Sequence, residues 1–356
     1  MIPPTPYLRW AQRHHGTAEH DLATSGIPSI AESELGPVAP LGDGAAYPAL
    51  KAAIARVTGA PPREVLPALG TSQALFTAYA SVLGEGDVAL VEHPVYEPLA
   101  VAARAVSARV THFERRHDRG YAVEVDAVMS RLEPRTRAVA ISSLHNPSGA
   151  RVPDATIAAL ASALAPRGVW LIVDEVYAPF DRFTSDDGVL PASARRLGPN
   201  VIAVSSLTKG FGVGLHRVGW MLAPEEIVER GVDAHIATVG LLPASHAAVG
   251  VRCLERLPEL AARARRLLGT KRERVAAWAQ ARSLEWSAPE AGLFGFARVG
   301  GSPLREVIEA GARDHGVLAV PGEFFGAPGA LRIAWSLDEA KLDPALARLE
   351  RVLARA

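Results

Sequence analysis

The sequence predicts an α/β fold, in which a mainly parallel sheet is covered by helices and is followed by a smaller C-terminal α+β domain. Short, almost continuously apolar runs alternate with segments of helical periodicity as far as residue 225. Apolar runs of this kind are typical of parallel strands that are buried on both faces. Beyond residue 225 the alternation stops, and longer helical stretches are mixed with a few strands, which indicates a second unit.

Length and composition restrict the class of protein. A chain of 356 residues is expected to form about two domains of roughly 150 residues each. Lys plus Arg and Asp plus Glu are equal at 38 each, so the charge does not favour binding to nucleic acid or a membrane surface. The single cysteine, Cys253, excludes an internal disulfide and a multi-cysteine metal site, and it is expected to be a buried, inert thiol. No signal peptide or membrane span is found in the pattern, so a soluble cytoplasmic protein is expected.

The elements can be assigned in order along the chain. Residues 1–45 are rich in Pro and Gly and predict an extended arm that adds to the small domain and the pocket. Residues 46–243 are expected to form the large domain, with strands at 64–69, 88–92, 110–113, 138–142, 169–174, 201–205 and 218–222 and helices at 48–59, 72–83, 97–106 and 154–164. Residues 244–356 are expected to form the small domain, with one long bridging helix at 244–282, strands at 293–299, 317–320 and 331–335, and helices at 303–315 and from 338.

The most unusual stretch is residues 205–220, which has Lys209 at its centre. A strand-like run leads this lysine into a glycine-rich turn rather than onto the exposed face of a helix. A desolvated lysine loses proton affinity and can form a Schiff base with a carbonyl group, such as the aldehyde of pyridoxal phosphate. An ordinary surface lysine is the alternative. The glycines here lack the spacing of a dinucleotide-binding loop, so Arg217 is free to act as a bidentate phosphate ligand.

Small polar residues follow the first predicted strand. Gly70 allows close approach of the backbone, and Thr71 and Ser72 stand where a helix begins. The free amides and the dipole of a helix start favour an anion such as a phosphate group. An ordinary Ser or Thr helix cap is the alternative.

Two further strand ends carry a possible ring-stacking group and an amide. Tyr96 could cover a planar ring, although packing in a loop explains it equally. Asn146 precedes a proline, which holds it extended, so its amide can be directed at a ligand oxygen. A simple turn is the alternative for Asn146.

The last candidates are an acid and an arginine within apolar strands. Asp174 ends a buried run, and it needs a cationic partner such as a protonated pyridine nitrogen, because the phosphate loop of a nucleotide hydrolase is absent. Tyr177 could then meet the phenolic oxygen of the same ring. Arg332 requires either a substrate carboxylate or an internal salt bridge. Asp181, Arg182 and His246 are expected to be solvated.

Six segments occur together in the order and spacing of a known family. They are Gly-Thr-Ser-Gln-Ala-Leu from residue 70, Glu-His-Pro-Val-Tyr from 92, His-Asn-Pro-Ser-Gly from 145, Asp-Glu-Val-Tyr from 174, Ser-Leu-Thr-Lys-Gly-Phe-Gly from 206 and Leu-Arg-Ile from 331. Over residues 45–335 the chain therefore resembles the fold type I, class I/II pyridoxal-phosphate aminotransferases. The resemblance implies a seven-stranded sheet, pyridoxal 5′-phosphate as cofactor, and a homodimer with the active site at the subunit interface.

The resemblance also implies a role for each matching residue. Lys209 resembles the lysine that holds the cofactor as an aldimine and moves the proton, and Asp174 the partner of the pyridinium nitrogen. Asn146 and Tyr177 are similar to the pair that contacts the phenolic oxygen. The remaining matches are Tyr96 for ring stacking, Thr71, Ser72, Ser206 and Arg217 for the phosphate, with Gly70 beside them, and Arg332 for the substrate carboxylate.

The N-terminal segment matches the family less closely. Ser25 and Gly26 resemble residues that line the substrate pocket. Many members carry a Tyr before the motif Pro-Ala-Leu-Lys that reaches the phosphate of the partner subunit, but here Pro40 and Leu41 stand in that region, with Tyr47 nearby.

The expected function is transfer of an amino group between an amino acid and a 2-oxo acid, through a Lys209 aldimine and pyridoxamine phosphate. A lyase, decarboxylase or β/γ-replacement enzyme shares all these residues and stays open. A non-catalytic sensor domain is a third possibility, although the chain has no room for a DNA-binding domain before residue 45.

Overall fold

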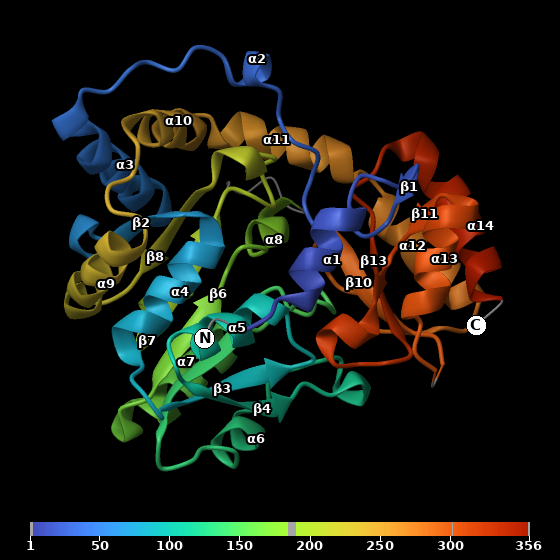
Figure 1. Cartoon of the computed structure of the whole chain (residues 1–356), viewed down its shortest axis with the longest axis horizontal. Helices are drawn as coiled ribbons and strands as arrows, with labels where there is room; N and C mark the ends of the chain where they lie inside the picture. Colours follow the sequence, from blue (N-terminus) through green and yellow to red (C-terminus); the bar gives the residue numbers. More distant parts are fainter. Residues whose placement is uncertain (1–2, 184–189, 301, 355–356) are drawn as a thin grey trace.

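The structure, a computed structural model, describes residues 3–183, 190–300 and 302–354 and has two parts (Figure 1). The larger part is built on a seven-stranded sheet in the order β2-β8-β7-β6-β5-β3-β4. Neighbouring strands from β7 to β4 are parallel, whereas β8 runs antiparallel to both β7 and β2. The predicted mainly parallel sheet is confirmed. Its strands are β2 (Val65–Leu69), β3 (Val88–His93), β4 (Arg109–Glu114), β5 (Thr136–Ser142), β6 (Trp170–Asp174), β7 (Val201–Ser206) and β8 (Val218–Leu222).

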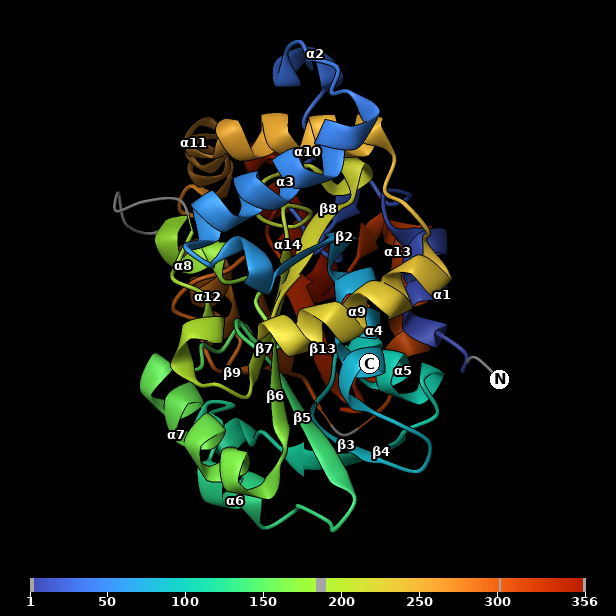
Figure 2. The ribbon, with the colours of Figure 1, turned by 90° about the vertical axis from the view of Figure 1, so that its left-hand side faces the viewer.

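Both faces of this sheet are covered, because successive strand residues point to opposite sides. In β6, Ile172 belongs to the core on one side of the sheet, while Leu171 and Val173 belong to the core on the other side. The two layers of helices are visible on either side of β5 and β6 in Figure 2. One layer contains α4 (Gly70–Val82), α5 (Glu97–Ala105) and α9 (Glu225–Thr238), and the other contains α6 (Val125–Met129) and α7 (Asp154–Leu164).

The N-terminal segment is not extended throughout, so this part of the sequence analysis is wrong. Residues Pro6–His14 form α1, which begins at Pro6 and buries Tyr7 and Trp10. In Figure 1 α1 lies between the large sheet and the C-terminal part. The short strand β1 (His20–Asp21) then pairs with β11 (Val317–Leu318) of the C-terminal part. Two more helices follow, α2 (Glu32–Leu35) and α3 (Asp43–Thr58).

The single long helix expected at 244–282 is also wrong. It consists of α10 (Ala244–Glu255), α11 (Leu257–Leu268) and α12 (Lys271–Ala281). The first break precedes Pro258, which lacks the N–H needed to continue a helix, and the second lies at Gly269, whose φ is +47°. Figure 1 shows α10 beside α3 and α11 leading towards the C-terminal part.

The C-terminal part has an antiparallel sheet in the order β12-β13-β10-β9. Cys253 is a buried free thiol whose pKa is raised to about 12 by burial, as expected for an inert side chain. Among the described residues no helix is long and apolar enough to cross a membrane. The remaining elements are α8 (Pro179–Phe183), β9 (Glu285–Trp286), β10 (Phe294–Arg298), α13 (Arg305–His315), β12 (Val320–Pro321), β13 (Ala330–Ala334) and α14 (Glu339–Leu353).

Candidate active site

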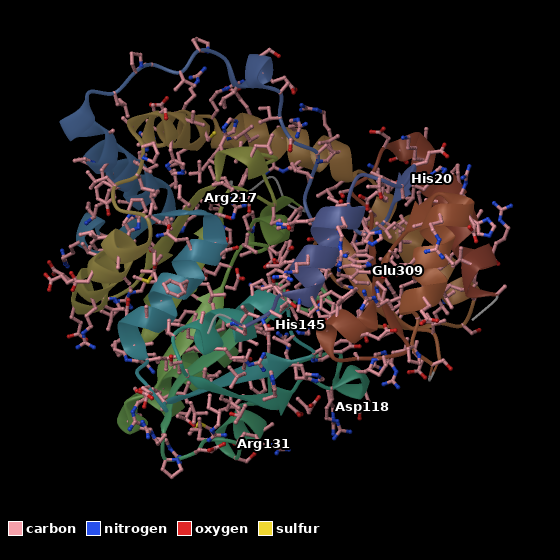
Figure 3. All side chains as sticks on the ribbon, in the orientation of Figure 1. His20, Asp118, Arg131, His145, Arg217 and Glu309 are labelled. Atoms are coloured by element: carbon pink, nitrogen blue, oxygen red, sulfur yellow. The ribbon has the colours of Figure 1, made fainter. Side chains whose placement is uncertain are left out.

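The polar residues that follow the strands meet in a cavity of about 340 Å³ at the carboxyl edge of the large sheet. In sheets of this kind the carboxyl ends of parallel strands lie at one edge, where ligands bind. The start of β8 lies at the same edge, because β8 runs antiparallel to its neighbours. The predicted residues that line the cavity are Thr71, Ser72, Tyr96, Asp174, Tyr177, Lys209 and Arg217, the last of which is labelled in Figure 3.

Lys209 is held against the N-terminal segment. Its Nζ lies 3.4 Å from Ser25 Oγ, and its carbonyl oxygen accepts a hydrogen bond of 3.0 Å from the backbone N–H of Ile27. A Cβ on Gly26 would lie 3.5 Å from Cδ of the lysine, so this segment packs directly on the side chain. Burial lowers the pKa of Lys209 to about 8, and the charges of Arg332 and Arg217 act in the same direction. About half of the amine is therefore unprotonated at pH 8.

Asp174 is a buried carboxyl group near the base of the cavity. Its Oδ1 accepts a hydrogen bond of 3.0 Å from the backbone N–H of Val176. Burial raises its pKa to about 7, and the charge of Glu92 adds to this rise, while the Val176 bond and the charge of Lys209 oppose it. A cationic ligand in the cavity would stabilise the ionised form.

The raised pKa predicts that Asp174→Asn makes the cofactor-free protein more stable at alkaline pH. The unfolded carboxyl titrates near 3.8 and the folded one near 7, so between these values the folded state binds more protons. The free energy of unfolding of the wild type therefore falls as pH rises from about 4 to 7 and is level above that range. In denaturant titrations, the free energy of unfolding of Asp174→Asn relative to that of the wild type should increase by roughly 2 kcal/mol between pH 5 and pH 8.

Asp118→Asn is the control for this experiment. Asp118 is exposed and forms an ion pair with Arg116, which lowers its pKa. Its removal should not produce the same increase in stability with pH. A difference between wild type and Asp174→Asn that does not change with pH would contradict the prediction.

A cluster of hydroxyl groups and a guanidinium lies at one end of the cavity. Thr71 Oγ1 donates a hydrogen bond of 2.8 Å to Ser206 Oγ, which lies 2.8 Å from Thr208 Oγ1. The guanidinium of Arg217 packs on Gly70, where an added Cβ would come within 2.6 Å of Nη2 and where φ is +77°. Only glycine meets both conditions without strain. Hydroxyls, a guanidinium and the start of α4 together suit a phosphate group.

Arg332 and Asn146 form a second polar group beside Lys209. Arg332 is fully buried on β13, and its Nη1 donates a hydrogen bond of 2.9 Å to Asn146 Oδ1. Its Nη2 donates to the hydroxyl of Tyr7 at 3.1 Å and to the carbonyl oxygen of Ala23 at 2.7 Å. These acceptors are all neutral, and no carboxylate among the described residues forms an ion pair with Arg332. The sequence analysis gave an internal salt bridge as one alternative for Arg332, and no such salt bridge is found among the described residues.

The surroundings of Arg332 are dry. Its guanidinium lies over the rings of Phe294 and Phe325, at 5.1 and 5.3 Å from their centroids. Both Arg332 Nε and Asn146 Nδ2 are buried without a hydrogen-bond partner among the described residues. Unsatisfied donors and an uncompensated charge are costly in free energy at a dry, buried position. Arg332 and Asn146 are therefore suited to binding an anionic ligand.

The two tyrosines of the cavity remain protonated. Burial raises the pKa of Tyr177 and that of Tyr96 above their ordinary range. The hydroxyl of Tyr177 donates to the carbonyl oxygen of Ser25 at 3.2 Å, and the ring of Tyr96 meets that of Tyr7 edge-on at 6.0 Å. Both phenols can thus donate a hydrogen bond at neutral pH.

Comparison with known proteins gives the family. A model of the family described as aminotransferase class I and II matches residues 16–349. The chain belongs to this family. It is 29% identical to capreomycidine synthase of Streptomyces vinaceus, over 99% of this chain and 94% of that protein. It is also 29% identical to an arginine–pyruvate transaminase of Pseudomonas aeruginosa, over 80% of this chain and 74% of that protein.

Solved structures support the fold. A PLP-dependent aminotransferase from Streptococcus suis superposes with a TM-score of 0.89 at 22% identity, covering 99% of this chain and 98% of that one. At this identity the likeness concerns the fold. The seven-stranded sheet and the small antiparallel sheet are therefore those of the class I and II aminotransferases.

The cofactor of this family is pyridoxal 5′-phosphate, and the residues present fit it. Among the described residues the buried Asn146 Nδ2 has no acceptor, and no ion pair is formed by the buried carboxyl of Asp174, whose pKa is raised by burial. The hydroxyls of Thr71, Ser206 and Thr208 lie together, and the guanidinium of Arg217 packs on Gly70 near them, which suits a phosphate group. Each of these features matches one polar group of the cofactor.

Several residues of the site were not found from the sequence. Thr208 also lines the cavity. A hydroxyl residue directly before Lys209 was a usable signal in the sequence. Leu8 and Gln12 of α1 line the cavity as well, and the sequence carried no signal for them.

Of the three residues expected to be solvated, only two can be placed. His246 is half-buried, with Nε2 3.2 Å from the carbonyl oxygen of Arg217, so it supports the site. Asp181 forms an ion pair of 3.0 Å with Arg151. The side chain of Arg182 lies outside the described residues.

Proposed function

We propose that this enzyme transfers an amino group between an amino acid and a 2-oxo acid. The observation that carries the proposal is the joint placement of a buried lysine with a lowered pKa, a buried carboxyl group and a guanidinium that has no carboxylate partner in the part of the chain that the structure describes. Lys209 provides an amine, Asp174 holds a cationic ring nitrogen, and Arg332 binds the carboxylate of an amino acid.

The proposed cofactor contacts follow from the chemistry of each side chain. Pyridoxal phosphate, when bound, supplies an electron-withdrawing ring that stabilises negative charge on the substrate α-carbon. Lys209 holds its aldehyde carbon and Asp174 its ring nitrogen. The other contacts are Asn146 and Tyr177 for the phenolic oxygen, Tyr96 for the ring face, and Thr71, Ser72, Ser206 and Arg217 beside Gly70 for the phosphate.

The chain's own residues then orient the substrate and move the proton. Arg332 binds the α-carboxylate, with Ser25 and Gly26 forming the wall beside Lys209. Lys209 Nζ is the base that removes the proton from the α-carbon, and its lowered pKa leaves a useful fraction of the amine free near neutral pH. Asp174 keeps a negative charge opposite the ring nitrogen throughout.

A lyase, decarboxylase or replacement enzyme is the second candidate. It is favoured by the similarity to capreomycidine synthase, a relative that is not named as a transaminase. The same lysine, carboxyl group and guanidinium would serve these reactions, because they too begin at the α-carbon.

A single-turnover experiment separates the candidates. The holoenzyme is mixed with an amino acid in the absence of a 2-oxo acid, starting with arginine because a relative is named for it, and product is counted per cofactor. A transaminase should release one 2-oxo acid per cofactor, stop, and resume when pyruvate is added. Continued turnover without an acceptor would exclude transamination in favour of the second candidate. Cofactor binding with no product from any amino acid would favour a sensor domain.

We also propose that two copies of the chain form a homodimer. Leu215 and Leu241 are 83% and 89% exposed, and Leu215 stands two residues from Arg217. Large apolar side chains exposed next to a ligand site are suited to cover by another chain. Light scattering of the holoenzyme measures the molar mass, and a monomer would contradict the proposal.

A further inference from the structure

We propose that Tyr7 is a substrate-binding residue, whose hydroxyl donates a hydrogen bond to the carboxylate bound by Arg332. The inference rests on the proposed function, in which Arg332 binds the substrate carboxylate. Tyr7 lies 325 residues from Arg332 in the chain and reaches it from α1, where its hydroxyl accepts a hydrogen bond of 3.1 Å from Nη2. The residue belongs to a segment that the composition describes only as rich in Pro and Gly.

The position of Tyr7 is held from both parts of the molecule. The backbone N–H groups of Tyr7 and Leu8 donate to the carboxylate of Glu97 on α5, at 3.0 and 3.1 Å. Three residues further along α1, Trp10 Nε1 donates to Glu309 on α13 at 3.0 Å, and Glu309 is labelled in Figure 3. These anchors fix the start of α1, so the hydroxyl of Tyr7 is placed before any ligand arrives.

The hydrogen bonds of Arg332 leave some of its N–H donors without an acceptor among the described residues. A guanidinium has five N–H donors, and three of them point at Asn146, Tyr7 and Ala23. Two donors have no partner within residues 3–183, 190–300 and 302–354, and one of them, Nε–H, is buried. A carboxylate can accept about four hydrogen bonds, which exceeds what those two donors supply.

Tyr7 supplies the missing donor. Because its oxygen accepts from Arg332, its own O–H hydrogen is left without an acceptor among the described residues. The hydroxyl is therefore polarised by the guanidinium and free to donate to an anion bound there. The ring of Tyr7 and those of Phe294 and Phe325 surround the guanidinium and exclude water, which strengthens such a bond.

The test uses the holoenzyme of Tyr7→Phe, which keeps the ring and removes only the hydroxyl. Its affinity is measured, from the absorbance of the bound cofactor, for an amino acid and for the matching amine that lacks the carboxylate. We expect the dissociation constant for the amino acid to rise by about 10- to 100-fold and that for the amine to stay the same. An equal rise of the dissociation constants for both ligands, or no rise of either, would overturn the inference.

Two controls separate direct contact from other causes. Tyr79→Phe removes a buried hydroxyl that has no hydrogen-bond partner in the described part of the chain, and it should leave both affinities unchanged. In an Arg332→Lys background, which keeps a cation for the carboxylate, Tyr7→Phe should still weaken binding of the amino acid. If it has no further effect there, Tyr7 acts only by positioning Arg332 and the inference is wrong.

The same titrations keep this inference apart from the proposed function. If the wild type binds the amino acid no better than the amine, the assignment of a carboxylate site at Arg332 fails. If the wild type prefers the amino acid and Tyr7→Phe retains the full preference, only the role of Tyr7 fails.

Discussion

Lys209→Ala is expected to lower the turnover number by about four orders of magnitude and to abolish the visible absorbance of lysine-bound cofactor. In the proposed function the side chain supplies both the amine that attaches the cofactor and the base that moves the substrate proton, so we expect no neighbouring group to replace it. Its lowered pKa, about 8, is what allows the free amine to act near neutral pH. Absorbance spectra after reconstitution and steady-state rates measure the two effects, and added small amines should restore part of the rate.

Lys271→Met is the matched control for Lys209. Lys271 is also a buried lysine, but its Nζ donates to the carbonyl oxygens of Leu267 and Leu337 and lies outside the cavity. Its replacement should lower stability and leave the visible absorbance intact. If Lys209→Ala retained that absorbance, the assignment of the cofactor lysine would be wrong.

Arg332→Met is expected to raise KM for an amino acid by about 100-fold or more, with a smaller change in kcat. The guanidinium is buried against aromatic rings and has only neutral partners among the described residues, so in the proposed function the substrate carboxylate provides its counter-charge. Removing the guanidinium should not lower the rate of turnover of an amine that has no carboxylate. Steady-state kinetics with both substrates give the comparison, and equal losses for the two would contradict the role.

Two other arginines serve as comparisons for Arg332. Arg116→Met removes an exposed guanidinium that pairs with Asp118, and it should leave KM unchanged. Arg115→Met breaks a fully buried ion pair with Glu92 and should lower the free energy of unfolding by about 3–5 kcal/mol, because an unpaired carboxylate is left behind. Arg332→Met leaves no unpaired acid among the described residues, so it should cost much less stability.

Most of the residues that we propose to hold the cofactor could be predicted because their signals are local. Asp174 ends its strand, Ser206 ends the next one, and Lys209 follows three residues later. Each residue is placed by a short apolar run and the turn after it. Since parallel strands end at one edge, local assignments are enough to bring Asp174 and Lys209 into one cavity, with Ser206 hydrogen-bonded to Thr71 of its lining.

The breaks in the helical stretch at 244–282 also have a local signal, because they arise at Pro258 and Gly269. The position of α1 could not be predicted in this way, because it depends on Glu97 and Glu309, which lie far from it in sequence.

The sequence by itself determined the fold class, the family resemblance and the residues that follow each strand. Only the tertiary structure decided that Arg332 has no carboxylate partner among the described residues, and that Tyr7 lies against it. The physical reason is that strand periodicity and turn residues act over a few neighbouring positions, whereas the partners of a buried charge are set by the packing of distant segments.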